Sequence, residues 1–211
     1  MKIEIDKKIL PTLPRVEYNG KIHVVDDEAK TRQALDALSQ ETIVGIDTET
    51  RPSFRKHEVH NVALLQVSTK TECYLFRLNM IPIIPELIDF LENENLLKVG
   101  LSLRDDCNAM HRKFEFTPGG FLDLQNLVKD YYITDMSLQK IYAIRCDRYI
   151  SKGQRLTNWE AQTLTPEQQR YAAMDAWACL NIYEYLKSCA LVPEQSKCIV
   201  NEEEENQDET I

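Results

Sequence analysis

The sequence predicts an α/β fold, and three observations lead to that prediction. The chain has 211 residues, of which 43% are hydrophobic, enough to bury the core of one sizeable domain. Its first hundred residues contain several short runs rich in β-branched residues, which are typical of buried strands. Later stretches carry apolar residues at helical spacing. We therefore expect an antiparallel meander, followed by strands that alternate with helices.

The start of the chain is expected to be irregular. Residues 1–20 contain Pro11, Pro14 and Gly20, which interrupt helices and strands. The N-terminus lacks the apolar segment of a secretory signal, and no run of roughly eighteen apolar residues exists, so we expect no membrane association. We place one folded domain at residues 21–192.

The first half of this domain is predicted to consist mainly of strands. A short apolar run at 21–25 precedes Asp26 and Asp27, either of which can cap a helix. Three further runs have the composition of strands and lie at 42–50, 62–68 and 73–76. A short turn joins the last two, so we expect these three strands to form the meander.

The second half is predicted to alternate strands and helices. Pro82 and Pro85 mark the start of one helix. Two more strands and two more helices are expected at 96–101 and 121–124, and at 125–132 and 138–144. The last helix starts at Thr165, where Thr165 and Gln168 form a capping box around Pro166, and runs to about Lys187.

Acidic residues stand where several of these elements begin or end. Asp47 and Glu49 lie two apart on a strand, so both point to one face, roughly 7 Å apart. A hard divalent cation such as Mg²⁺ or Mn²⁺ would relieve their repulsion, whereas a solvated strand end would make the pair unremarkable. Asp105 and Asp106 open a helix, where they can simply complement the helix dipole.

Tyr171 and Asp175 share one face of the last helix because they lie four residues apart. They suit either a metal-binding aspartate with a tyrosine that orients water, or a core tyrosine whose hydroxyl is bonded to the aspartate. A third pattern is a run of basic residues that an ordinary solvated surface would also explain. Its members are Lys140, Arg145, Arg148, Lys152 and Arg155.

The net charge of −9 at first argues against a nucleic-acid partner. Six acidic side chains, however, lie within the last eleven residues, and we expect the stretch 193–211 to be a disordered acidic tail. The six cysteines contain no CxxC pair, which argues against a zinc site and favours reduced thiols in a cytoplasm.

Three segments together resemble the motifs of the DEDDy 3′–5′ exonucleases. They are Val44-Gly45-Ile46-Asp47-Thr48-Glu49, then Val99-Gly100-Leu101 followed by Asp106, and Tyr171-Ala172-Ala173-Met174-Asp175-Ala176. The segments 62–66 and 155–159 are similar to parts of the Werner-syndrome exonuclease domain and its ribonuclease D-like relatives. The resemblance covers roughly residues 22–187.

This resemblance implies a ribonuclease H-like fold, with a mixed five-stranded sheet and helices on both faces. It also implies hydrolysis of the 3′-terminal phosphodiester, with release of nucleoside 5′-monophosphates. Asp47, Glu49, Asp106 and Asp175 would hold two divalent ions, Mg²⁺ or Mn²⁺. Tyr171 would position or help to deprotonate the attacking water. The family's count from Gly100 favours Asp106 over Asp105.

The nucleic-acid substrate is expected to be a single strand or a recessed 3′ end, with DNA favoured over RNA. Lys152 and Arg155 are expected to contact backbone phosphates. Trp159 would stack a base or, in the favoured alternative, anchor its loop from the core. The competing hypotheses are a catalytically silent nucleic-acid or protein-binding domain and a hydrolase of small oligonucleotides.

Overall fold

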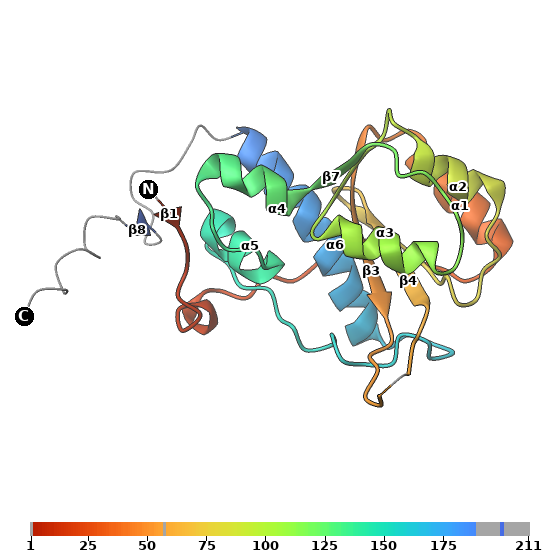
Figure 1. Ribbon diagram of the computed structural model, residues 1–211, viewed down its shortest axis with the longest axis horizontal. Coiled ribbons are helices and arrows are strands. Elements are labelled where there is room, and N and C mark those ends of the chain that lie inside the picture. Colours follow the sequence, from red (N-terminus) through yellow and green to blue (C-terminus); the bar gives the residue numbers. More distant parts are fainter. Residues whose placement is uncertain (1, 57, 189–198, 201–211) are drawn as a thin grey trace, which may run out of the picture.

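The computed structural model describes residues 2–56, 58–188 and 199–200 (Figure 1). Its centre is one mixed sheet with the order β2-β5-β4-β3-β6-β7. The strands are β2 (Lys21–Val25), β3 (Ile43–Thr50), β4 (Val62–Ser68), β5 (Glu72–Phe76), β6 (Leu97–Gly100) and β7 (Phe121–Asp123). The meander β3-β4-β5 is antiparallel, and the pairs β2-β5, β3-β6 and β6-β7 are parallel.

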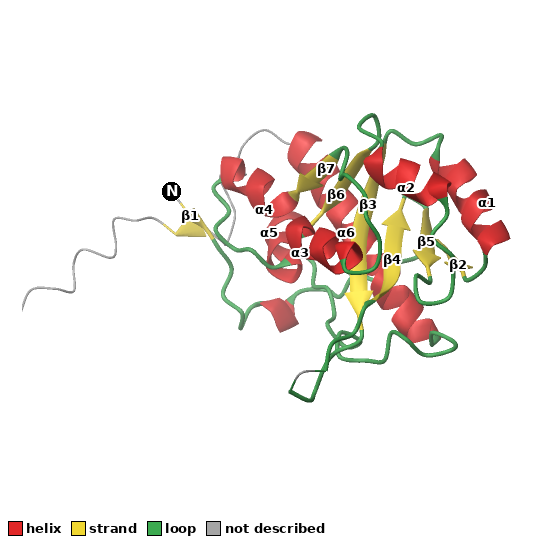
Figure 2. Cartoon of the chain, turned by 45° about the vertical axis from the view of Figure 1, so that its right-hand side comes forward, coloured by secondary structure: helices red, strands yellow, loops and turns green. Residues whose placement is uncertain are grey.

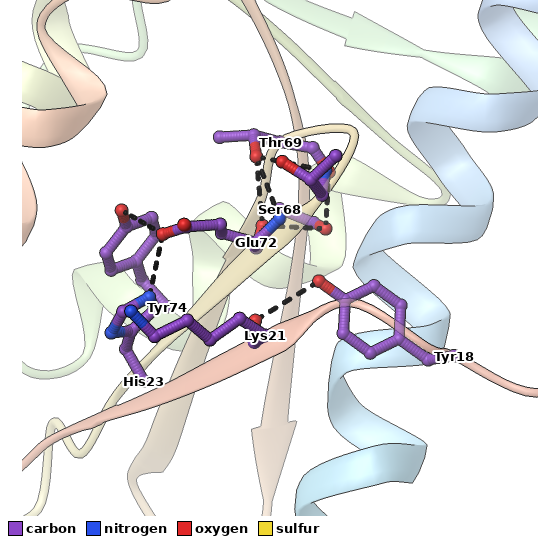
Figure 3. A network of polar contacts seen from close by, with 8 residues as sticks. Tyr18, Lys21, His23, Ser68, Thr69, Glu72 and Tyr74 are labelled. Atoms are coloured by element: carbon purple, nitrogen blue, oxygen red, sulfur yellow. Dashed lines mark hydrogen bonds and ion pairs between the residues drawn. The ribbon is translucent and has the colours of Figure 1, made fainter.

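The α/β fold predicted from the sequence is confirmed, with six strands in the sheet rather than five. The sixth is β2, which was predicted as a strand and pairs along its whole length with β5 at the sheet edge. Side chains tie this edge together: Glu72 accepts hydrogen bonds from Tyr74 (3.1 Å) and pairs with His23 at 2.7 Å, as Figure 3 shows. The count of five strands came from the family resemblance, whereas the sequence runs themselves had included β2.

Helices cover both faces of the sheet (Figures 1 and 2). One face is covered by α1 (Glu28–Leu38), α2 (Pro85–Glu92) and α3 (Leu103–His111). The other is covered by α4 (Leu124–Leu127), the 3-10 helix η2 (Val128–Tyr131), α5 (Leu138–Cys146) and α6 (Pro166–Ser188). No helix in the described part of the chain is long and apolar enough to cross a membrane.

The predicted helix caps are largely those observed. At the start of α6, the Gln168 backbone N–H donates to the Thr165 hydroxyl (3.2 Å) and the Thr165 N–H donates to the Gln168 side chain (3.0 Å). This is the expected capping box. Of the two candidates before α1, Asp27 is the cap, because it accepts from the Lys30 N–H at 2.8 Å.

Residues 2–20 are mostly irregular, with two short pieces of regular structure. The short strand β1 (Lys2–Ile3) pairs antiparallel with β8 (Ile199–Val200), and a 3-10 turn, η1, spans Leu10–Thr12. Ile3 and Leu10 are buried in the same core cluster as residues of α5 and α6, so this irregular segment packs onto the domain. The remainder of the predicted acidic tail lies outside the described residues.

Candidate metal centre

The end of β3 carries the first two acidic residues of the site. Gly45, Asp47 and Glu49 alternate along the strand, so all three face α6. A Cβ on Gly45 would lie 1.9 Å from the carbonyl oxygen of Ala176, so only glycine lets α6 approach this closely. That close approach delivers Asp175, which sits one residue before Ala176, to the same place.

Three carboxylates meet here. One oxygen each from Asp47, Glu49 and Asp175 can be chosen so that all three atoms lie within 4.8 Å of one another. Such a group of oxygen ligands suits a hard divalent cation. Asp47 and Glu49 are half-buried, so the cluster is open enough to be reached from solvent.

Asp106 approaches the cluster from α3, on the other side of the strand. The Thr48 hydroxyl donates a hydrogen bond to Asp106, which ties the helix to the β3 residue between Asp47 and Glu49. Asp105, the competing candidate, is exposed. The structure therefore brings Asp106, not Asp105, to the cluster, although Asp106 is not one of the three mutually close ligands.

Burial raises the pKa of every carboxyl in the cluster, and repulsion between its members adds to the rise for Asp47 and Glu49. For Asp47 the pKa is raised well above its usual value by burial first, and then by Asp106, Asp175 and Glu49. Burial, with Asp175 and Asp106, raises the pKa of Glu49 to about 9, while Arg155 opposes the rise. Protons or cations must therefore compensate the cluster at neutral pH.

Burial also raises the pKa values of the other two carboxyls, those of Asp175 and Asp106. Burial raises the pKa of Asp175 to about 7, against the hydrogen bond from Tyr171 and the charge of Lys152. Burial raises the pKa of Asp106 to about 6, against its bond from Thr48. A doubly charged cation satisfies such a set, because it replaces several protons at once.

The buried side-chain amide of Gln66, beside Asp47, also suits a bound ion or water. Gln66 on β4 lies directly opposite Asp47 on β3, so the two side chains share one face. Gln66 is fully buried, and neither its amide nitrogen nor its oxygen has a hydrogen-bond partner among the described residues. A cation with its water would give this amide a partner, which a dry carboxylate cluster does not.

Tyr171 lies beside Asp175, one turn earlier on α6. Burial, and then the nearby Asp175, Glu49 and Asp47, raise the pKa of Tyr171. The phenol is therefore protonated at neutral pH and can donate a hydrogen bond. Deprotonation of a water by Tyr171, one of the two roles expected for it, does not suit this environment.

The predicted nucleic-acid contacts are only partly brought to the site. Lys152 and Arg155 are exposed, and their charges lower the pKa values of Asp175 and Glu49, so both lie near the cluster. Trp159 is fully buried, and its ring lies 6.1 Å from that of Tyr171. The expectation that it stacks a base is therefore wrong, and the alternative of a buried anchor holds.

Asp123 is a site-positioning residue that the sequence analysis missed. Its carboxylate accepts hydrogen bonds from the N–H groups of Ser102 (3.1 Å) and Leu103 (2.9 Å), which begin α3, and of Gln125 (2.9 Å) in α4. It thereby fixes the helix that carries Asp106. An aspartate directly before a predicted helix is a capping signal, but only the fold shows that it also caps a second helix.

Known proteins resemble the chain in sequence and in fold. A family model described as 3′-5′ exonuclease matches residues 22–189. The mouse protein "Bifunctional 3'-5' exonuclease/ATP-dependent helicase WRN" is 28% identical over 86% of this chain, and the match covers 14% of that protein. "Exonuclease 3'-5' domain-containing protein 2" of Drosophila melanogaster is 35% identical over 59% of this chain and 22% of its own length. The chain thus spans under a quarter of both relatives.

Solved structures show the same fold. The EXO domain of Aedes aegypti Nibbler superimposes with a TM-score of 0.74 at 20% identity, over 82% of this chain and 91% of that one. Escherichia coli RNase D, described as an exoribonuclease involved in structured RNA processing, gives a TM-score of 0.72 at 19% identity. That match covers 80% of this chain and 44% of that one.

Proposed function

Because this chain belongs to the 3′–5′ exonuclease family, we propose that it hydrolyses the 3′-terminal phosphodiester of a nucleic acid and releases nucleoside 5′-monophosphates. The observation that carries the proposal is the meeting of Asp47, Glu49 and Asp175 within 4.8 Å, with Asp106 close enough to raise the pKa of Asp47. Each position of the DEDDy motifs is occupied by the residue type that the chemistry needs.

Asp47, Glu49, Asp106 and Asp175 would hold two divalent ions, Mg²⁺ or Mn²⁺. When bound, such ions lower the pKa of a water nucleophile and stabilise the charge on the phosphate and on the leaving 3′ oxygen. The raised pKa values of the four carboxyls support this role, because they leave the cluster short of positive charge.

The chain's own groups would orient the reactants. The protonated hydroxyl of Tyr171, beside Asp175, would donate to the attacking water and hold it in line with the phosphorus. Lys152 and Arg155, exposed next to the carboxylates, would contact the phosphates that flank the scissile bond. Their charges would also draw the acidic cluster and the anionic substrate together.

The substrate we propose is a single strand or a recessed 3′ end, with DNA preferred to RNA. The preference rests on the likeness to the Werner-type exonuclease segment in the mouse relative. Ribonuclease D proteins also belong among the similar proteins, so RNA must be tested in parallel. Contacts to the 2′ position would decide between the two.

The test is cleavage of oligonucleotides labelled at the 5′ end, as DNA and RNA, single-stranded and with a recessed 3′ end, with Mg²⁺ or Mn²⁺. The proposal predicts a ladder that shortens from the 3′ end, with 5′-mononucleotides as product. Binding without cleavage would favour the silent binding domain instead. Turnover of dinucleotides but not of longer strands would favour the small-oligonucleotide hydrolase. Asp47→Ala is the control, and it must remove any cleavage that is observed.

A further inference from the structure

Two adjoining cavities follow one face of α6 away from the carboxylate cluster. The first, of about 410 Å³, is lined by Tyr171 and Met174 among others, and the second, of about 1010 Å³, by Trp177 and Tyr185. Residues 15–18 line both cavities, and we call the two cavities together the α6 groove. It begins at the tyrosine of the candidate active site.

The far end of the α6 groove contains a buried guanidinium, two of whose nitrogens have no hydrogen-bond partner among the described residues. Arg145, on α5, is only 7% exposed. Its Nε and one terminal nitrogen, Nη2, are buried and have no hydrogen-bond partner among the described residues. Its guanidinium lies 5.1 Å from the ring centre of Tyr185. Burying an unpaired guanidinium is costly, and an anion that enters the groove would remove that cost.

The surroundings of Arg145 are basic and aromatic. Five of the residues that line the large cavity carry positive charge, namely Arg15, Lys21, Lys70, Arg145 and Arg148, against the acids Glu17 and Asp147. Lys70 is paired with Glu184 (2.7 Å) and Arg15 with Glu17 (3.8 Å). Arg145, Arg148 and Lys21 remain as the cations that could receive an anion, in a chain whose net charge is −9.

The groove has a fixed wall and flat aromatic surfaces. Val16 N–H donates to the Tyr149 carbonyl (3.0 Å), and the Tyr18 hydroxyl donates to the Lys21 carbonyl (3.4 Å; Figure 3). Trp177 is held by its ring N–H, which donates to the Lys70 carbonyl at 3.2 Å. Tyr185 is 42% exposed. Cations interleaved with aromatic rings are the features with which proteins bind single-stranded nucleic acids.

We propose that the α6 groove binds the single strand upstream of the 3′ end, with Arg145 and Arg148 on a backbone phosphate and Tyr185 against a base. This inference rests on the proposed function and extends its site. The distance along α6 from Tyr171 to Tyr185 is about 21 Å, or roughly six stacked nucleotides. A stacked strand shorter than this does not reach from the carboxylate cluster to Arg145, and a trinucleotide falls well short of that length.

The test compares a 12-nucleotide single strand with a trinucleotide as substrates of Arg145→Ala and Arg148→Ala. Each variant is expected to raise KM for the 12-mer about tenfold and to leave kcat/KM for the trinucleotide unchanged. Because a phosphate contact is lost, the slope of log affinity against log salt should become shallower by about 0.7. Arg32→Ala, which removes an exposed arginine from α1 on the opposite face, is the matched control and should change neither substrate.

Binding is measured separately from cleavage, by fluorescence anisotropy of a labelled 12-mer, so that this proposal can fail independently of the proposed function. An affinity for the 12-mer that is unchanged in both arginine variants would overturn the proposal. So would an equal loss for the trinucleotide and the 12-mer. If Arg145→Ala lowers the melting temperature sharply, Arg148→Glu carries the test, because Arg148 is exposed. A nucleoside 5′-monophosphate is also tested as a competitor, at the same phosphate concentration as the unlabelled 12-mer. If it competes as strongly as the 12-mer, the groove is a mononucleotide site and the strand assignment is overturned.

Discussion

Lys98 and the carboxylates of β3 are charged groups on neighbouring strands, but only the lysine is satisfied by the protein itself. Lys98 is 0% exposed, and its ammonium donates to the carbonyls of Asn93 (2.8 Å), Leu96 (3.1 Å) and Gly119 (2.8 Å). The rings of Phe90 and Phe121 lie 5.5 and 5.4 Å away. Each of its three protons has an acceptor.

The carboxylates at the end of β3 have the opposite arrangement. Asp47, Glu49 and Asp175 repel one another, and the amide of Gln66 opposite Asp47 has no partner among the described residues. Asp123 shows how a carboxylate can be satisfied within the same protein, because on β7 it accepts hydrogen bonds from three backbone N–H groups. The comparison teaches that compensated buried charge holds this fold together, whereas uncompensated charge marks a place for an external ion.

The largest expected effect separates activity from stability at Asp47. Asp47→Asn should lower the cleavage rate at least about a thousandfold, because metal ligation supplies several kcal/mol of transition-state stabilisation. The same change should leave the melting temperature of the metal-free protein unchanged or higher, because it removes a buried carboxyl that must either bind a proton or repel its neighbours. Single-turnover assays and thermal melting check both parts. A large fall in the melting temperature would instead show that Asp47, like Lys98, stabilises the fold.

Lys98→Met is expected to do the reverse. It leaves three carbonyls without their donor and should lower the free energy of unfolding by about 3 kcal/mol. The rate of cleavage at a temperature where the variant is folded should stay unchanged. Urea unfolding, paired with the oligonucleotide assay, measures both quantities. A variant that is as stable as the wild type but cleaves more slowly would contradict this expectation.

Tyr171→Phe should slow cleavage about tenfold, the effect of losing one hydrogen bond worth about 1.4 kcal/mol. Because the phenol is protonated and is not itself a ligand, metal affinity should survive the change. Titration of Mn²⁺ into both proteins is the accompanying measurement. An unaffected rate would remove the tyrosine from the mechanism.

Without metal, the free energy of unfolding should depend on pH, and bound metal should weaken that dependence. The folded protein keeps a proton on Glu49 up to its pKa of about 9, whereas the unfolded chain loses it near the ordinary glutamate pKa of 4.5. The folded state therefore binds more protons between these values, and the free energy of unfolding should fall as pH rises through this window. Saturating Mg²⁺ should flatten the fall, as should Glu49→Gln without metal. Melting curves that rise with pH in the metal-free protein contradict this picture.

The sequence predicted the carboxylates more fully than their surroundings. Alternation along β3 put Asp47 and Glu49 on one face, and helical spacing did the same for Tyr171 and Asp175, because both patterns are local. The motif order then linked segments far apart in the chain. Whether those side chains meet depends on Gly45 and its contact with α6, which no local pattern expresses.

The residues that were misplaced are those whose environment is set by packing between elements. One of the two roles expected for Trp159 was base stacking, but its side chain is buried beside Tyr171. The basic run from Lys140 to Arg155 was treated as one feature. In the structure Lys140 pairs with Asp135 (2.6 Å), Arg145 is buried along the α6 groove, and Lys152 and Arg155 lie near the carboxylates.

The most direct test of the uncompensated cluster is calorimetric titration of Mn²⁺ into the metal-free protein at pH 7, in two buffers with different ionisation enthalpies. Mn²⁺ is expected to bind with release of protons, because Glu49 holds a proton at this pH and Asp175 is close to half-protonated. Asp175→Asn should weaken the binding and reduce the proton release. Equal binding by the wild type and Asp175→Asn, or no binding by either, would contradict it.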